Sequence, residues 1–102
     1  PLGGDVKGNI EKVKQYTRYA LLCGTAPVVS HFYALCLDDC IPKERELGMA
    51  AGLSLLWFCD ELWIFGDTIT TGMQSEIDFC KKLNIRVRHI KESEVMKTIG
   101  GN

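Results

Sequence analysis

The apolar positions of this chain alternate between helical spacing and short strand-like runs. Ile10, Val13 and Thr17 recur with helical spacing, whereas Leu62 begins a wholly apolar run of four residues. The first pattern indicates an amphipathic helix, and the second indicates a strand buried on both faces. The whole pattern predicts four helices: one that ends near residue 23, and three over residues 43–58, 71–83 and 92–99. It predicts strands over residues 26–30, 62–65 and 85–90, and a loop over residues 31–41.

Helices and strands alternate throughout this predicted order. Such alternation is typical of α/β proteins, in which right-handed crossovers place parallel strands in one sheet. Three strands make a thin sheet, however, and the chain opens on a glycine-rich loop that leads into a helix. We therefore expect an α/β fold with a parallel sheet whose first strand lies upstream of Pro1.

Composition and charge narrow the classes of function. The chain has 102 residues, which suits one domain over residues 1–102, and a net charge of −1, which argues against nucleic acid polymers and anionic membranes as partners. Its longest apolar stretch, residues 47–59, is interrupted by Gly48, Gly52 and Ser54, and there is no signal peptide. Five cysteines without a Cys-x-x-Cys pair predict neither a zinc site nor a disulfide framework. We expect a cytoplasmic protein without a metal or cofactor.

The helix predicted over residues 43–58 is apolar on almost every side beyond its charged first turn. A helix of this kind must be covered on every side, and the sheet of so small a domain covers only one. Gly48, Ala51 and Gly52 would let a neighbouring backbone approach closely. We therefore expect a homodimer or higher homo-oligomer that forms through this helix.

The stretch after the strand over 62–65 contains the first candidate site. Gly66 and Asp67 end the strand, and Thr71 is predicted to cap the next helix, with Gln74 completing a capping box. Glu76 then flanks the apolar stripe of that helix, above the carboxyl end of the sheet, where open α/β sheets bind ligands. The alternative is that Glu76 simply suits the helix dipole, as many acidic residues in first turns do.

The predicted loop over residues 31–41 contains a second group of candidates. It carries His31, Phe32, Tyr33, Asp38 and Asp39 directly after a predicted strand. Aromatic rings, a histidine and paired acids at the end of a strand would suit the lining of a pocket. A packed surface loop with its aromatic rings turned inward is an equally good interpretation.

Four segments of the chain resemble a known family. They are residues 1–9 (Pro-Leu-Gly-Gly-Asp-Val-Lys-Gly-Asn), 29–31 (Val-Ser-His), 44–48 (Glu-Arg-Glu-Leu-Gly) and 59–63 (Cys-Asp-Glu-Leu-Trp). They resemble small phage and bacterial proteins of the DUF4406 and DUF7768 type, which in turn resemble the nucleoside 2-deoxyribosyltransferase superfamily. The resemblance covers the chain to about residue 90. It implies a flavodoxin-like, three-layer α/β/α fold, in which Pro1 belongs to the loop after the first strand.

The resemblance also implies a site. Enzymes of that superfamily carry a Gly-x-x-x-Glu motif whose glutamate is the nucleophile, and residues 72–76 (Gly-Met-Gln-Ser-Glu) have this spacing. Glu76 is thereby implied as the nucleophile, and Asp67 as the residue that binds sugar hydroxyls or helps to protonate the leaving base. The implied substrate-binding residues, with Gly3 and Gly4 facing a 5′-phosphate, are Pro1, Gly3, Gly4, Asp5, His31, Gly66, Gly72 and Met73.

Two functions follow from this resemblance. The first is an N-glycosidase or 2-deoxyribosyltransferase acting on nucleosides or nucleotides, because a carboxylate beneath the anomeric carbon stabilises or traps an oxocarbenium-like transition state. The second is a non-catalytic nucleotide-binding or interaction domain. Asp78 leaves the second function open, since it replaces the glycine that usually stands two residues after the glutamate in those enzymes.

Overall fold

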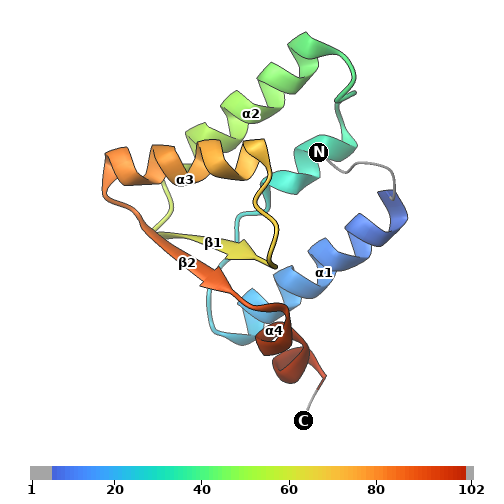
Figure 1. The fold of residues 1–102 in the computed structure, drawn as a ribbon, viewed down its shortest axis with the longest axis vertical. Coiled ribbons are helices and arrows are strands. Elements are labelled where there is room, and N and C mark those ends of the chain that lie inside the picture. The colour runs from blue at the N-terminus through green and yellow to red at the C-terminus, as the bar shows by residue number, and fades with distance from the viewer. Residues whose placement is uncertain (1–5, 101–102) are drawn as a thin grey trace.

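The computed structural model describes residues 6–100 as a mixed α/β fold with a two-stranded parallel sheet (Figure 1). The elements in chain order are α1 (Val6–Leu22), the 3₁₀ helix η1 (Ser30–Leu35), α2 (Pro42–Leu56), β1 (Glu61–Phe65), α3 (Thr71–Leu83), β2 (Arg86–Ile90) and α4 (Glu92–Ile99). The predicted helices and the second and third predicted strands are thus confirmed, with their ends shifted by at most two residues. Pro42 occupies the first turn of α2, where its missing N–H leaves no hydrogen bond unmade.

The strand predicted over residues 26–30 is wrong. Val29 has an extended backbone, with φ −112° and ψ 91°, but Ser30 already begins η1. Extended backbone becomes a strand only when a neighbouring strand satisfies its hydrogen bonds. Within residues 6–100 the sheet consists of β1 and β2, which do not pair with this segment. The three-stranded sheet is therefore reduced to two strands in the part of the chain that the structure describes.

β1 and β2 pair in parallel, with Leu62 opposite Val87 and Ile64 opposite His89. The connection between them runs through α3, which contacts both strands. On the other side of the sheet, Trp63 and Phe65 pack against a core of Tyr19, Ile90 and Val95. Figure 1 shows the same division, with α2 and α3 on one side of the strands and α1 and α4 on the other.

Helices α1 and α4 are joined by side-chain hydrogen bonds. Tyr16 Oη donates to Glu92 Oε2 at 2.6 Å, and Lys12 forms an ion pair with the same carboxylate. The ring of Tyr16 also stacks on Phe65, with the two ring centroids 4.4 Å apart. These contacts hold both helices against the end of β1.

The ends of α3 are fixed by local interactions. Thr70, and not the predicted Thr71, is the N-cap, because its Oγ1 accepts a hydrogen bond from the backbone N–H of Met73 at 3.2 Å. The predicted partner Gln74 instead donates to Asp78 at 2.9 Å. At the other end Asn84 adopts the left-handed conformation, with φ 59°, and closes the helix. The predicted apolar stripe is correct: Ile77 and Cys80 are buried.

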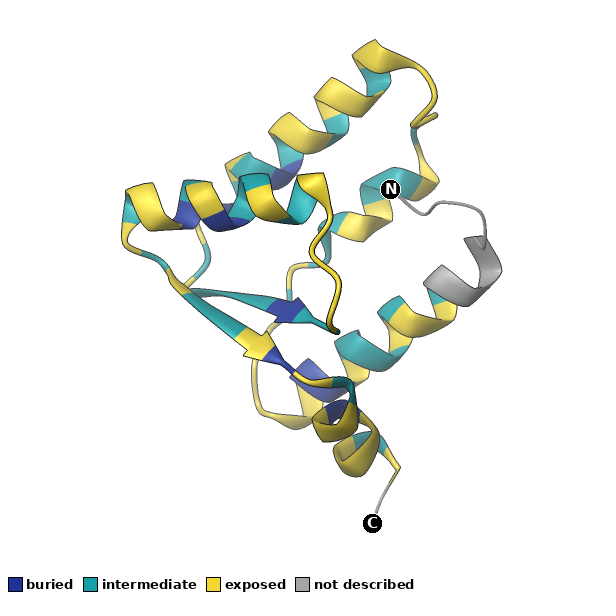
Figure 2. Ribbon diagram, in the orientation of Figure 1, coloured by how far each residue is buried: buried dark blue, intermediate teal, exposed yellow. Residues whose placement is uncertain are grey.

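The description of α2 as apolar on almost every side is accurate, but much of its surface is exposed. Only Gly52 and Leu56 are buried within the helix. Leu47 in the helix is 56% exposed, and Trp57 and Phe58, which follow its last residue, are 63% and 89% exposed. Figure 2 shows this contrast, with buried residues confined to the side of α2 that faces α3.

Candidate functional site

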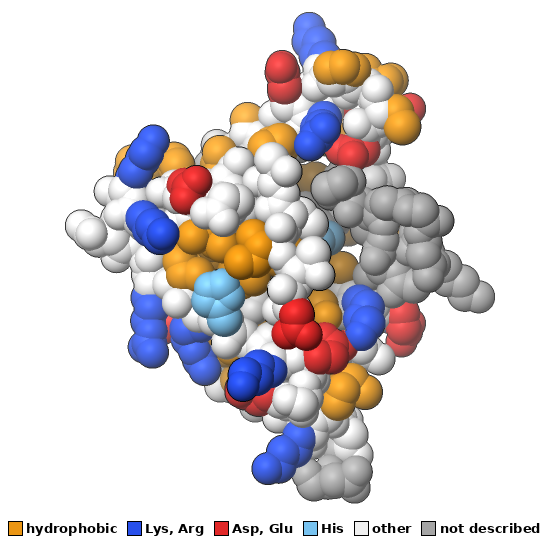
Figure 3. Space-filling model, in the orientation of Figure 1, with side chains coloured by type: hydrophobic (Ala, Val, Ile, Leu, Met, Phe, Trp, Pro, Cys, Tyr) orange, Lys and Arg blue, Asp and Glu red, His pale blue; other side chains and the backbone are white. Residues whose placement is uncertain are grey.

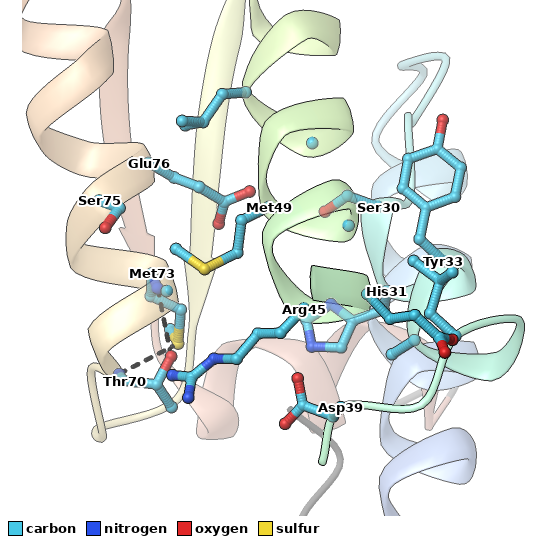
Figure 4. Close-up of a pocket in the computed structure, with 17 residues that line it drawn as sticks. Ser30, His31, Tyr33, Asp39, Arg45, Met49, Thr70, Met73, Ser75 and Glu76 are labelled. Atoms are coloured by element: carbon cyan, nitrogen blue, oxygen red, sulfur yellow. Dashed lines mark hydrogen bonds between the residues drawn. The ribbon is translucent and has the colours of Figure 1, made fainter. Parts of the chain in front are cut away.

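A pocket opens between η1, α2 and α3, and Figure 4 shows the side chains that surround it. Residues from η1 form one wall, α2 the second, and the first turns of α3 the third. The lining residues that carry acidic, basic, hydroxyl or imidazole groups are Ser30, His31, Tyr33, Asp39, Glu44, Arg45, Thr70, Ser75 and Glu76.

Glu76 points from the second turn of α3 into this pocket (Figure 4). Its carboxylate lies against α2 at Gly52, where an added methyl group would be 3.8 Å from Glu76 Oε2. The same methyl group would be 3.6 Å from Ser30 Cβ and 3.9 Å from Ser30 Oγ. The absence of a side chain at Gly52 therefore lets Glu76 and Ser30 meet from two different elements.

Burial is the main influence on the ionisation of Glu76. It raises the pKa of the carboxyl above the usual value of 4.5, and the nearby Ser30 hydroxyl partly offsets this increase. Among residues 10–100, whose side chains the structure describes, the salt bridges are Lys12–Glu92 and Arg86–Glu61, so Glu76 has no ion-pair partner there. A partly buried carboxyl without a counter-ion is unusual unless a ligand uses it, which makes Glu76 the centre of the candidate site.

The mouth of the pocket carries groups of both charges. The Arg45 side chain extends from α2 towards Thr70, and Asp39 lies opposite it on the segment between η1 and α2 (Figure 4). Nearby, desolvation lowers the pKa of His31, which favours the neutral imidazole. Neutral imidazole both donates and accepts hydrogen bonds. The mouth can therefore bind a polar ligand that presents donors and acceptors.

The structure brings together part of the predicted site. Glu76, Gly72, Met73 and His31 all line the pocket. Of the candidates in the predicted loop over residues 31–41, His31, Tyr33 and Asp39 line this pocket, and the first part of that segment belongs to the 3₁₀ helix η1 instead of a loop. Pro1, Gly3, Gly4 and Asp5 lie outside the described residues.

Gly66 and Asp67 are not among the residues that line this pocket. Gly66 has φ +84°, and an added Cβ there would be 3.8 Å from Tyr16 Oη. Asp67 raises the pKa of Tyr16, which burial and Glu92 raise more strongly. Both residues thus lie at the end of β1 beside α1, and their implied contact with substrate stays a prediction.

Sequence reasoning missed Ser30, Arg45 and Gly52 as site residues. Each of these residues belongs to a sequence pattern that predicts something other than a site. Ser30 belonged to a segment that resembled the family, Arg45 to the charged first turn of a helix, and Gly52 to a group of small residues expected to admit a neighbouring backbone. Only the packing of η1 and α3 against α2 shows that these positions line the same pocket.

Neither a metal-binding cluster nor a helix able to span a membrane is present in the described part of the chain. Within residues 6–100 no cluster of three His, Cys, Asp or Glu side chains is placed to hold a metal ion. No helix there has both the length and the apolar character needed to cross a membrane. All five cysteines are free, and Cys80 is buried in the face of α3 that packs inward.

Comparison with known proteins gives a family but no characterised relative. No curated protein and no solved structure matches the chain. A family model described as a domain of unknown function, DUF7768, matches residues 1–90, which include α1, α2, both strands and every residue of the pocket. The chain belongs to the DUF7768 family.

Proposed function

We propose that this protein is an N-glycosidase or 2-deoxyribosyltransferase that acts on a nucleoside or nucleotide, with Glu76 as the nucleophile. The observation that carries the proposal is the Glu76 carboxylate, which points into the pocket without an ion-pair partner among the described side chains of residues 10–100. Cleavage of an N-glycosidic bond develops positive charge at the anomeric carbon. A carboxylate beside the anomeric carbon stabilises that charge or forms a glycosyl ester with it.

The neighbouring residues support this chemistry. His31 and Tyr33 offer hydrogen bonds to a sugar or base from η1, and Met73 offers an apolar surface from α3. Attack by Glu76 requires the ionised carboxylate. Because burial raises its pKa, base release is expected to fall as the pH drops through that raised value.

The finer fold belongs to the same proposal. We infer a flavodoxin-like, three-layer arrangement of the nucleoside 2-deoxyribosyltransferase type. It is supported by the parallel pairing of β1 and β2 and by the helices on both sides of the strands (Figure 1). The position of Glu76, near the start of the helix that follows β1, fits the Gly-x-x-x-Glu motif of that superfamily.

A non-catalytic nucleotide-binding domain is the second candidate. One observation favours it: Asp67, the residue implied to assist the leaving base, does not line the pocket with Glu76. In that case a nucleotide would bind at the same site and raise the melting temperature without being cleaved.

The proposal is tested by incubating the protein with a panel of nucleosides and nucleoside monophosphates and measuring free base by chromatography. The wild type is expected to release one base, and Glu76→Gln to release none. The matched control is Asp78→Asn on the same helix, because Asp78 is exposed and bonded to Gln74 outside the pocket. Equal turnover by wild type and Glu76→Gln would exclude Glu76 as the nucleophile. A thermal shift without turnover would support the binding domain.

A homo-oligomer is the proposed quaternary state. Leu47, Trp57 and Phe58 of α2 and its C-terminal end expose large apolar surfaces, and Figure 3 shows apolar side chains at the surface on the face drawn. A second copy of the chain would remove these surfaces from water. Light scattering at micromolar concentration is expected to give at least twice the monomer mass, and a monomeric mass would disprove the proposal.

A further inference from the structure

Ser30 and Glu76 meet in a narrow space that Gly52 leaves open. Gly52 is buried in α2, and the position of its absent Cβ is within 4 Å of both Ser30 Oγ and Glu76 Oε2, at 3.9 and 3.8 Å. Figure 4 shows the two side chains pointing towards one another from η1 and α3. The Ser30 hydroxyl and the Glu76 carboxylate are therefore brought together beside Gly52.

This arrangement meets a specific requirement of the proposed chemistry. A nucleophilic carboxylate must be ionised and held in one orientation, yet a partly buried carboxylate without a cation tends to keep its proton. A hydroxyl that donates a hydrogen bond stabilises the ionised form and limits rotation of the side chain. The hydroxyl is the only polar group of the Ser30 side chain, and it can donate one hydrogen bond.

We propose that Ser30 is the positioning residue of the site: its hydroxyl donates to the Glu76 carboxylate, keeps it ionised and aims its free oxygen at the substrate. This inference rests on the proposed function, since it assigns Ser30 a part in the same reaction. Ser30 does not attack the substrate and acts only through Glu76. Its position at the start of η1 is what brings it to the pocket, because the preceding segment is extended and η1 turns the chain back towards α2.

The other ionisable groups around Glu76 do not replace Ser30. The groups that line the same pocket are His31 and Tyr33 from η1, Asp39 from the following segment, and Glu44 and Arg45 from α2. On its own helix, Glu76 also raises the pKa of Cys80, together with burial and Cys59. None of these groups forms an ion pair with Glu76 within residues 6–100.

The test compares Ser30→Ala, Ser30→Thr and Ser30→Cys in the full chain. Two quantities are measured for each variant: the pH profile of base release, and the titration of the Glu76 side-chain carboxyl by NMR, identified by its loss in Glu76→Gln. Ser30→Ala and Ser30→Cys are expected to move the acid limb of the profile and the carboxyl titration to higher pH, with activity recovered at alkaline pH. Ser30→Thr keeps the hydroxyl and is expected to keep both values.

The two readouts separate the possible failures. If Ser30→Ala titrates as the wild type does, or loses activity equally at every pH, the inference is wrong and Ser30 has only a structural part. If the wild type releases no base, the proposed reaction fails, and the NMR titration still decides whether Ser30 holds the carboxylate. Should Ser30→Ala not fold, Ser30→Cys decides the matter, because it keeps the shape of the side chain with a much weaker donor.

Discussion

Gly52→Ala makes the close approach of α2 to Glu76 directly measurable. The added methyl group would be 3.6 Å from Ser30 Cβ and 3.8 Å from Glu76 Oε2, which are ordinary van der Waals distances, so no atom has to move. Alanine is more favourable than glycine in a helix interior by about 1 kcal/mol. The methyl group also removes water from one side of the carboxylate, which disfavours its ionised form.

These two effects depend differently on pH. Below pH 4.5, the usual pKa of glutamate, Glu76 is protonated, and the helix effect acts alone. The variant should then gain about 1 kcal/mol in the free energy of unfolding, which corresponds to a rise of about 4–8 °C in melting temperature for a domain of this size. Above the raised pKa, the poorer solvation of the ionised carboxylate offsets part of that gain.

Urea denaturation of wild type and Gly52→Ala measures both effects when it is done at one pH below 4.5 and at one pH above the raised pKa of Glu76. The matched control is Gly48→Ala, one turn earlier in α2, where the methyl group would be 3.2 Å from Leu37 Cδ1 and would contact no carboxylate. Its effect on stability should be independent of pH. The reasoning is refuted if Gly52→Ala is destabilised in acid, or if its gain is the same at both pH values.

Three further substitutions test the site and its supports. Glu76→Gln should increase the free energy of unfolding at neutral pH but not below pH 4.5. The pKa of Glu76 is raised in the folded protein, so the ionised carboxylate opposes folding at pH values above that pKa. Urea denaturation at neutral pH and below pH 4.5 measures the change. Thr70→Ala should lower the free energy of unfolding by about 1 kcal/mol, because it removes the N-cap of α3, and Thr71→Ala should lower it less. Thermal denaturation that finds Thr71→Ala the less stable variant would contradict the observed cap. Tyr16→Phe should lower the free energy of unfolding by about 1 kcal/mol, because it removes the hydrogen bond to Glu92. Lys12 and, to a smaller extent, Tyr16 lower the pKa of Glu92, so the bond stabilises the fold most when that carboxylate is ionised. Urea denaturation should therefore show a larger loss above pH 4.5 than below it.

The sequence determined the elements whose stability is local. The helix ending near residue 23 and the helix over residues 92–99 follow from apolar spacing, and the structure places them at Val6–Leu22 and Glu92–Ile99. The strand at Glu61–Phe65 follows from an uninterrupted apolar run beside Gly66, whose φ of +84° ends it. Patterns of this kind depend on residues close in sequence, so the chain alone contains them.

The strand over residues 26–30 could not be decided in that way. A short apolar segment is compatible with a strand, but only a neighbouring strand makes it one, and that neighbour is a property of the tertiary structure. The N-cap of α3 also depends on the folded backbone and not on the sequence pattern alone. The sequence favours Thr71, because Gln74 follows three residues later, but the backbone turn lets Thr70 reach the N–H of Met73 instead.

The sequence by itself therefore determined the order of the helices, the two paired strands, and Glu76 as the acidic residue of interest. Tertiary structure alone decided which residues surround it. Ser30, Gly52 and Glu76 are separated by more than twenty residues from one to the next, and they meet because η1, α2 and α3 pack together. Local spacing shows which face of a helix is apolar, whereas the neighbours of the half-buried Glu76 carboxylate are set by the packing of elements distant in the chain.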